Sequence, residues 1–128
     1  MSKFSVSNFS QEDIQIHAKE IEGGAELEFV GEISMPDPSD ILFSYMTQVH
    51  QQAMEHGFSE VRLDFTKLEY LNSAGILLFL KWIKMIQDAS PELRYTLHIV
   101  YAGERDWQRV GIVTVAKMAA GVVKTTKT

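Results

Sequence analysis

Residues 68–80, "LEYLNSAGILLFL", change from an extended pattern to a strongly apolar helical one within a few positions. The polar pair Asn72-Ser73 and the small pair Ala74-Gly75 lie at the change. Small polar residues favour helix N-termini because their side chains accept hydrogen bonds from backbone N–H groups that have no partner within the helix. The stretch therefore predicts a strand, a tight connection and a helix that starts at Asn72 or Ser73.

A serine at the start of a helix has two interpretations. Its hydroxyl can cap the helix, which is a structural role. Alternatively, it can carry a phosphate, which adds about −1.5 to −2 charges beside the partially positive helix N-terminus. The small residues Ala74 and Gly75 leave room for a kinase to approach Ser73. Both interpretations stay open on the local sequence.

The helix after Ser73 is expected to run to about residue 88. Its apolar arc is wider than the roughly 100° that a surface helix needs. One apolar stripe contains Ile76, Phe79, Leu80 and Ile83. A second stripe contains Leu78, Trp82 and Met85. The helix is therefore either buried on two sides within the domain, or it presents this second stripe to a partner or a second subunit.

The segments before this stretch alternate between strand and helix patterns. Apolar and polar residues alternate at 14–18 and 25–32 around the turn at Gly23-Gly24, which predicts a hairpin with one wet face. The prolines of "MPDPSD" end the second strand. Ser39 or Asp40 is expected to cap a helix that closes at residues 56–57.

The later segments continue the alternation. Residues 61–65 and 94–102 predict two further strands, and 104–112 predict a short helix. The ambiguous segment 113–124 begins with a possible helical turn, "TVAKMAAG", and "VVKTT" after it reads as an edge strand. The order β-β-α-β-α-β-α-(β) predicts an α/β domain with a mixed β-sheet and helices packed on it. We expect a single domain over residues 1–128, with its core at about 12–112 and a frayed "KTTKT" end.

The composition excludes several classes of protein. Apolar residues make up 45% of the 128 residues, which is enough for an ordinary core. The net charge of −5 argues against a nucleic-acid groove or an anionic membrane patch. The absence of cysteine rules out disulfides, thiolate metal sites and a cysteine nucleophile. Because no signal-peptide pattern and no apolar run near the roughly 20 residues of a membrane span are present, we expect a cytoplasmic protein.

The segment "VRLDFTKLEYLNSAGILLFLKWI" resembles the signature of STAS domains, the fold of anti-sigma factor antagonists. The segment "LEFVGEIS" resembles the second strand of that family. On this resemblance, which covers about residues 12–112, Ser73 lies at the phosphoacceptor of the family and Gly75 at its glycine. The resemblance implies an STAS-like fold and a bacterial signal-transduction protein that acts by partner switching rather than by catalysis.

Two neutral residues depart from the family pattern beside the phosphoacceptor. Asn72 and Ser34 stand where the family usually has aspartates, and Ala74 replaces the usual Ser or Thr. These changes make the site less acidic. The segments "YLNSAG" and "GEISMPDPSDILFSYM" are also similar to the SiaC-like regulators, in which Asn precedes the phosphoacceptor. The unphosphorylated form of those proteins activates a diguanylate cyclase, so this output is an alternative.

The resemblance implies a switch at Ser73. When Ser73 is unphosphorylated, the chain is expected to bind an anti-sigma factor that is also a serine kinase, and so to regulate transcription. Phosphorylation releases this partner, and a PP2C-type phosphatase resets the switch. The expected partner-binding residues are Asn72, Ala74, Gly75, Leu78, Trp82, Met85 and Ser34. A constitutive docking or small-ligand-binding STAS domain is a further alternative, and the oligomeric state is open between monomer and homodimer.

The sequence does not indicate an enzyme. Ser73 lacks the Gly-x-Ser-x-Gly elbow of serine hydrolases. The histidines are His17, His50, His56 and His98. Their spacing does not match that of metal ligands, so we expect neither a metal nor a cofactor.

Overall fold

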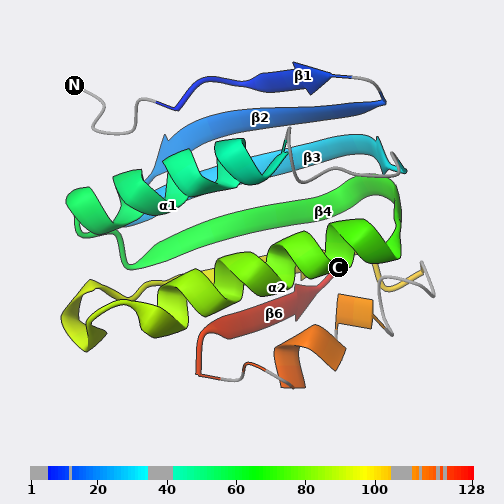
Figure 1. Cartoon of the computed structure of the whole chain (residues 1–128). Coiled ribbons are helices and arrows are strands. Elements are labelled where there is room, and N and C mark those ends of the chain that lie inside the picture. Colours follow the sequence, from blue (N-terminus) through cyan, green and yellow to red (C-terminus); the bar gives the residue numbers. More distant parts are fainter. Residues whose placement is uncertain are drawn as a thin grey trace.

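The described strands form one six-stranded sheet in which neighbours in the sequence are neighbours in space (Figure 1). The structure is a computed structural model, and it describes residues 6–11, 13–34, 42–104, 111–112, 114–117, 119 and 121–128. Three antiparallel strands come first, β1 (Phe9–Gln11), β2 (Ile14–Ile21) and β3 (Gly24–Ile33). Three strands then continue in parallel from β3, namely β4 (Glu60–Leu71), β5 (Thr96–Tyr101) and β6 (Val123–Lys127).

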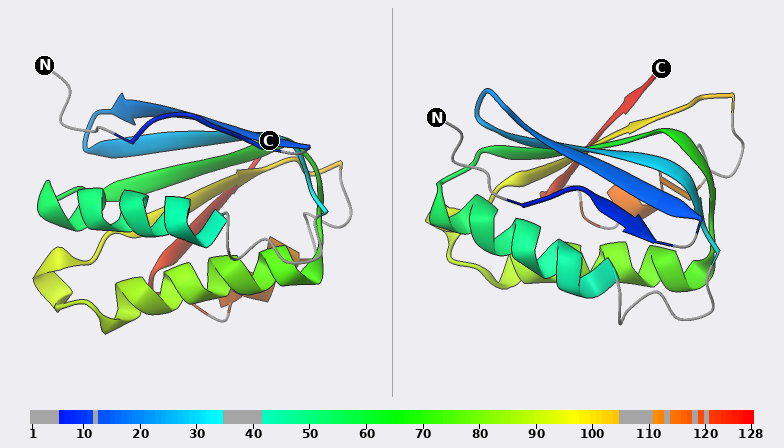
Figure 2. Two further views of the ribbon diagram at one scale, coloured as in Figure 1. Left: turned by 45° about the horizontal axis from the view of Figure 1, so that its top comes forward. Right: turned by 90° about the horizontal axis from the view of Figure 1, so that it is seen from above.

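Both long helices lie on the same face of the sheet (Figure 2). Helix α1 (Ser44–Glu55) connects β3 to β4. Helix α2 (Ser73–Asp88) and the short 3-10 helix η2 (Pro91–Leu93) connect β4 to β5. Parallel strands need such crossovers, because their carboxyl ends lie at the same edge of the sheet. Helix α2 therefore starts at this carboxyl edge, directly after β4.

The covered face of the sheet is apolar because alternate residues of each strand point toward the helices. Phe29 of β3 and Phe65 of β4 meet edge to face, with ring centroids 5.1 Å apart. The ring of Phe79 on α2 lies 5.3 Å from that of Phe65, and all three side chains are buried. Aromatic contacts of this geometry stabilise beyond their buried area, so the cluster fixes α2 on the middle of the sheet.

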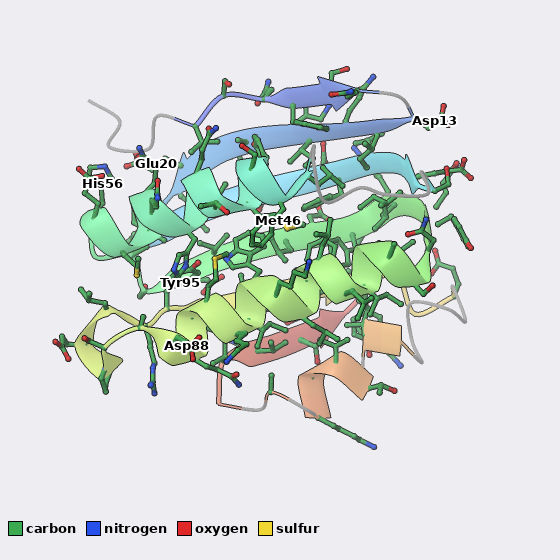
Figure 3. The ribbon with its side chains drawn as sticks, in the orientation of Figure 1. Asp13, Glu20, Met46, His56, Asp88 and Tyr95 are labelled. Atoms are coloured by element: carbon green, nitrogen blue, oxygen red, sulfur yellow. The ribbon has the colours of Figure 1, made fainter. Side chains whose placement is uncertain are left out.

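A buried polar cluster joins the two helices. The Tyr95 hydroxyl accepts a hydrogen bond from Trp82 Nε1 of α2 at 2.7 Å and lies 2.8 Å from Nδ1 of His50 on α1. Figure 3 labels Tyr95 between α1 and α2. Because the indole N–H can only donate, the hydroxyl proton of Tyr95 is available to His50 Nδ1. Burial lowers the pKa of His50 and raises the pKa of Tyr95, so both side chains are neutral at pH 7.

The opposite face of the sheet carries a ladder of charged side chains. Glu26 of β3 lies 3.5 Å from Lys19 of β2 and 3.4 Å from Arg62 of β4. Glu60 accepts a hydrogen bond from Arg62 at 3.3 Å and lies 3.0 Å from Nδ1 of His98. Burial alone would raise the pKa of Glu60, but His98 and Arg62 outweigh it and hold this pKa below its usual value. The ladder neutralises its own charges and keeps this face polar.

The predicted mixed sheet and most of its elements are confirmed. Helix α2 has the predicted start and end, and the antiparallel hairpin of β2 and β3 is present. The strand predicted at 61–65 is longer and reaches Leu71. The helix predicted after "MPDPSD" is α1, whose buried residues include Tyr45, Met46, Val49 and Ala53. Its expected cap at Ser39 or Asp40 lies outside the described residues, as does most of the helix predicted at 104–112.

Two predictions about the ends of the chain are wrong. The short strand β1 precedes the hairpin and is absent from the prediction. The "KTTKT" end is not frayed, because β6 pairs in parallel with β5 from Val123 to Lys127. The sheet therefore extends past the core expected at 12–112, and the predicted edge strand at 122–126 is part of it.

Candidate functional site

Asn72 holds the start of α2 at the carboxyl edge of the sheet. Its side-chain Oδ1 accepts a hydrogen bond from the backbone N–H of Gly75 at 2.8 Å. Its own backbone N–H donates to the carbonyl of Ile33, the last residue of β3, at 3.0 Å. Asn72 is therefore the N-cap of α2, and it also ties the helix to the neighbouring strand.

Gly75 allows the first turn of α2 to pack closely against the strand ends. It is buried, and a Cβ atom at this position would lie 2.5 Å from Cδ1 of Leu71 and 3.0 Å from Cγ2 of Ile33. A larger residue would crowd these side chains and shift the helix. Gly75 therefore has a packing role in the folded chain, and its predicted contact with a partner stays a prediction.

Ser73 is the first residue of α2 and is exposed. Its hydroxyl has no hydrogen-bond partner in the described part of the chain, because Asn72 supplies the cap. The sequence left the cap open between these two residues, and the structure assigns it to Asn72. Within the described residues, the Ser73 hydroxyl is therefore left without a partner, beside the partially positive N-terminus of the helix.

Two exposed apolar side chains lie within four positions of Ser73 in the sequence. Tyr70, near the end of β4, is 46% exposed, and Leu77, one turn into α2, is 58% exposed. With Leu93, they are the exposed large apolar residues of the described chain. Exposed apolar groups that gather at one place are typical of surfaces that bind other proteins. Neither residue was predicted from the sequence, although the four-residue spacing of Ser73 and Leu77 places these two on one side of the helix.

Leu78 and Trp82 do not form a docking face in the folded chain. Leu78 is 2% exposed and Trp82 is 0% exposed, because this side of α2 packs into the core. Trp82 is further held by its hydrogen bond to Tyr95. The prediction that these residues contact a partner is therefore wrong, and α2 is buried on two sides. Met85, from the same stripe, is half-buried against the core.

Five of the predicted site residues are brought together at the carboxyl edge, since Asn72, Ser73 and Gly75 are joined there by Ser34 and Ala74. Ser34 is exposed directly after β3, and Ala74 is half-buried beside Ser73. The hydrogen bond between Asn72 and Ile33 brings Ser34 close to the cap. Met85 is not part of this group, because twelve helical residues place it about 18 Å from Ser73 along the axis.

The described residues contain neither a cluster of metal-ligating side chains nor a helix that could cross a membrane. They contain no group of three or more His, Asp or Glu side chains that could hold a metal ion. His50 bonds to Tyr95 in the core, whereas His98 belongs to the ladder on the opposite face. In the same residues, no helix has the length and apolar character needed to cross a bilayer.

Comparison with known proteins gives a similarity in fold. No family model matches the sequence, and no curated protein matches it. Among solved structures, the crystal structure of an anti-sigma factor antagonist from Mycobacterium paratuberculosis is similar, with a TM-score of 0.62 over 92% of both chains. The chain has the fold of an anti-sigma factor antagonist. The sequence identity is 17%, so the similarity concerns the fold.

The antagonist fold confirms the predicted STAS-like α/β architecture. Its mixed sheet carries helices on one face, as the order of elements in the sequence implies. In this chain, the antagonist fold places Ser73 on the exposed start of α2, at the carboxyl edge of the parallel strands. This edge is our candidate site.

Proposed function

We propose that the chain is a regulatory protein-binding module that acts by partner switching. The surface around unphosphorylated Ser73 binds a partner protein, and a phosphate on Ser73 releases it. The partner we propose is an anti-sigma factor that is also a serine kinase, and a PP2C-type phosphatase resets the switch. The motif around Ser73 and the similarity in fold to an anti-sigma factor antagonist support this proposal. In this role the chain supplies no catalytic group.

One observation carries the proposal, namely that Asn72 caps α2 while the exposed Ser73 hydroxyl has no hydrogen-bond partner among the described residues. Asn72 caps the helix, so Ser73 can gain a phosphate without the loss of a cap. The hydroxyl is exposed, and a kinase needs such access. The exposed side chains of Tyr70 and Leu77 supply the apolar surface that a partner would cover.

The same geometry explains how a phosphate would release the partner. A phosphate at the helix N-terminus is stabilised by the helix dipole, so α2 stays folded. The added charge must then lose water when a partner covers Leu77, and it repels any acidic group in the contact. Each 1.4 kcal/mol of such cost weakens binding about tenfold, so a few kcal/mol switch the complex off.

Mass spectrometry tests the switch directly. Intact protein from its native host is weighed before and after phosphatase treatment, and peptides that cover residues 68–81 are mapped. We expect one removable phosphate on Ser73. The Ser73→Ala variant should lose it, whereas Ser90→Ala, at another exposed serine, should keep it. A chain that stays unmodified under all growth conditions would refute the switch and leave a constitutive docking module.

The downstream output is decided by the partner. The SiaC-like alternative predicts a diguanylate cyclase, and Asn72 is compatible with it because Asn supplies the cap before the phosphoacceptor. Ser73→Ala locks the unphosphorylated state, so this variant should retain its partner when purified from the native host. Identification of a kinase that binds a sigma factor supports the first output, and identification of a cyclase supports the alternative.

A further inference from the structure

A strip of surface on the outer side of α2 is formed by Leu77, Lys81 and the neighbouring Phe43. We call this surface the α2 strip. Leu77 and Lys81 are exposed and lie four residues apart on one side of the helix. The Lys81 ammonium lies 5.7 Å from the centroid of the half-buried Phe43 ring, which directly precedes α1. The strip begins one helical turn after Ser73, so it continues the candidate site along α2.

The α2 strip is positively charged although the chain has a net charge of −5. Among the described residues, no carboxylate lies within ion-pair distance of Lys81. The next lysine, Lys84, is neutralised by Asp88 at 3.4 Å. Toward Ser73, the strip adjoins the partially positive helix N-terminus, where the cap Asn72 brings no negative charge. Among the described residues, an exposed apolar side chain therefore lies beside a lysine that no carboxylate pairs.

We propose that the α2 strip binds an acidic, amphipathic segment of a partner protein. An apolar side chain of this segment covers Leu77, and a carboxylate pairs with Lys81. These two groups must lie about 6 Å apart, which is the separation of side chains four positions apart on a helix. The proposal rests on the proposed function only in placing the partner at the start of α2.

Two features of the strip favour a carboxylate over other groups. The Phe43 ring shields one side of the Lys81 ammonium from water, and an ion pair is stronger where water is partly excluded. An acidic segment is also the kind that a phosphate on Ser73 repels most strongly. The charge of the partner and its release by phosphorylation are then two results of the same contact.

A displayed library of random peptides tests the proposal on the full-length, unphosphorylated protein. We expect enriched peptides to combine Asp or Glu with a large apolar residue. A synthetic consensus peptide is then titrated against variants by fluorescence anisotropy. Leu77→Ser should weaken its binding about tenfold. Lys81→Glu should also weaken it, and a new selection on this variant should enrich Lys and Arg instead.

Matched controls lie elsewhere on the surface. Leu93→Ser changes another exposed leucine, and Lys124→Glu changes an exposed lysine on β6. Neither should alter binding of the consensus peptide, and circular dichroism should show that all four variants are folded. Enrichment of basic or uncharged peptides, absence of enrichment, or equal losses in the controls would overturn the proposal. A dimer in sedimentation velocity that Leu77→Ser dissolves would overturn it as well.

The Ser73→Glu variant tests the proposed phosphorylation switch independently of the proposed binding at the α2 strip. If this variant loses the consensus peptide together with Leu77→Ser, the strip is supported and the charge at Ser73 controls it. If Ser73→Glu binds normally while Leu77→Ser does not, the strip is still supported and the proposed switch fails.

Discussion

The two sides of α2 have different roles, although both contain leucine. The inner side buries Leu78 and Trp82 against the sheet and α1, whereas the outer side exposes Ser73 and Leu77. Leu77 and Leu78 are adjacent and chemically identical, yet one is 58% exposed and the other 2%. The comparison teaches that residue type does not separate stability from binding on this helix. The position of each residue relative to the covering elements does.

The largest effect is expected when the inner side is truncated. Trp82→Ala leaves a cavity and removes the indole donor to Tyr95, so we expect it to lower the free energy of unfolding by about 3–5 kcal/mol. The matched change on the outer side, Leu77→Ala, should stay within about 0.5 kcal/mol. Urea titrations measure both. Similar losses for the two variants would break the comparison.

A smaller effect is expected at the cap, where the two sides meet. Asn72→Ala removes the acceptor for the Gly75 N–H and should cost about 1 kcal/mol. Asn72→Asp keeps an acceptor oxygen and should retain most of the stability. Thermal unfolding compares the two variants. If Asn72→Ala is neutral and Ser73→Ala is destabilising, then Ser73 is the cap. The proposed switch would then lose the observation that the cap is supplied by another residue.

The inner side of α2 should also make the free energy of unfolding depend on pH, whereas the outer side should not. Burial lowers the pKa of His50 below its ordinary value of 6.5, so the unfolded chain takes up a proton first as the pH falls. The stability is therefore complete above about pH 6.5 and declines as the pH falls toward the folded pKa. Glu60 does not interfere, because its lowered pKa lies below 4.5.

Denaturation midpoints from about pH 7.5 to about pH 5.5 measure this slope. His50→Gln keeps an acceptor for the Tyr95 hydroxyl and does not titrate, so its profile should be flatter over this range. A wild-type profile as flat as that of His50→Gln would show that the buried cluster tolerates the proton.

The smallest effect is expected on the outer side. Ser73→Glu places a negative charge at the first residue of α2 and should raise the free energy of unfolding by about 0.5 kcal/mol. Ser73→Gln is the neutral control and should be without effect. Chemical denaturation at low salt resolves the difference. A destabilised Ser73→Glu variant would mean that phosphorylation opens the helix instead of changing its surface.

Much of the fold could be predicted because its signals are local. The change of pattern at residues 68–80 gives the end of β4 and the start of α2, and alternation gives the hairpin of β2 and β3. β1 escaped prediction because three residues are too few to show a period. An edge strand was predicted at 122–126, but its partner was not, because its place depends on β5, which is distant in the sequence.

The position of the candidate site could be predicted from the sequence, but the roles and exposure of its residues could not. The motif identified Ser73, whereas the choice between Asn72 and Ser73 as cap needed the contacts to Gly75 and Ile33. The wide apolar arc of α2 concealed which leucine is exposed. That depends on how α1 and the sheet divide the surface of α2, and no periodicity within one helix contains this information.

The order of the sheet also shapes how the molecule can be assembled during synthesis. Each strand from β2 to β6 lies beside the strand made just before it, so every new strand meets a neighbour that has already left the ribosome. Pairings between strands that follow one another in the chain keep the contacts local, which favours fast folding. Of the described strands, β6 is synthesised last, so the edge of β5 stays unpaired until residues 123–127 are made. The nascent chain can therefore complete α2, together with Ser73, before the last strand is added to the sheet.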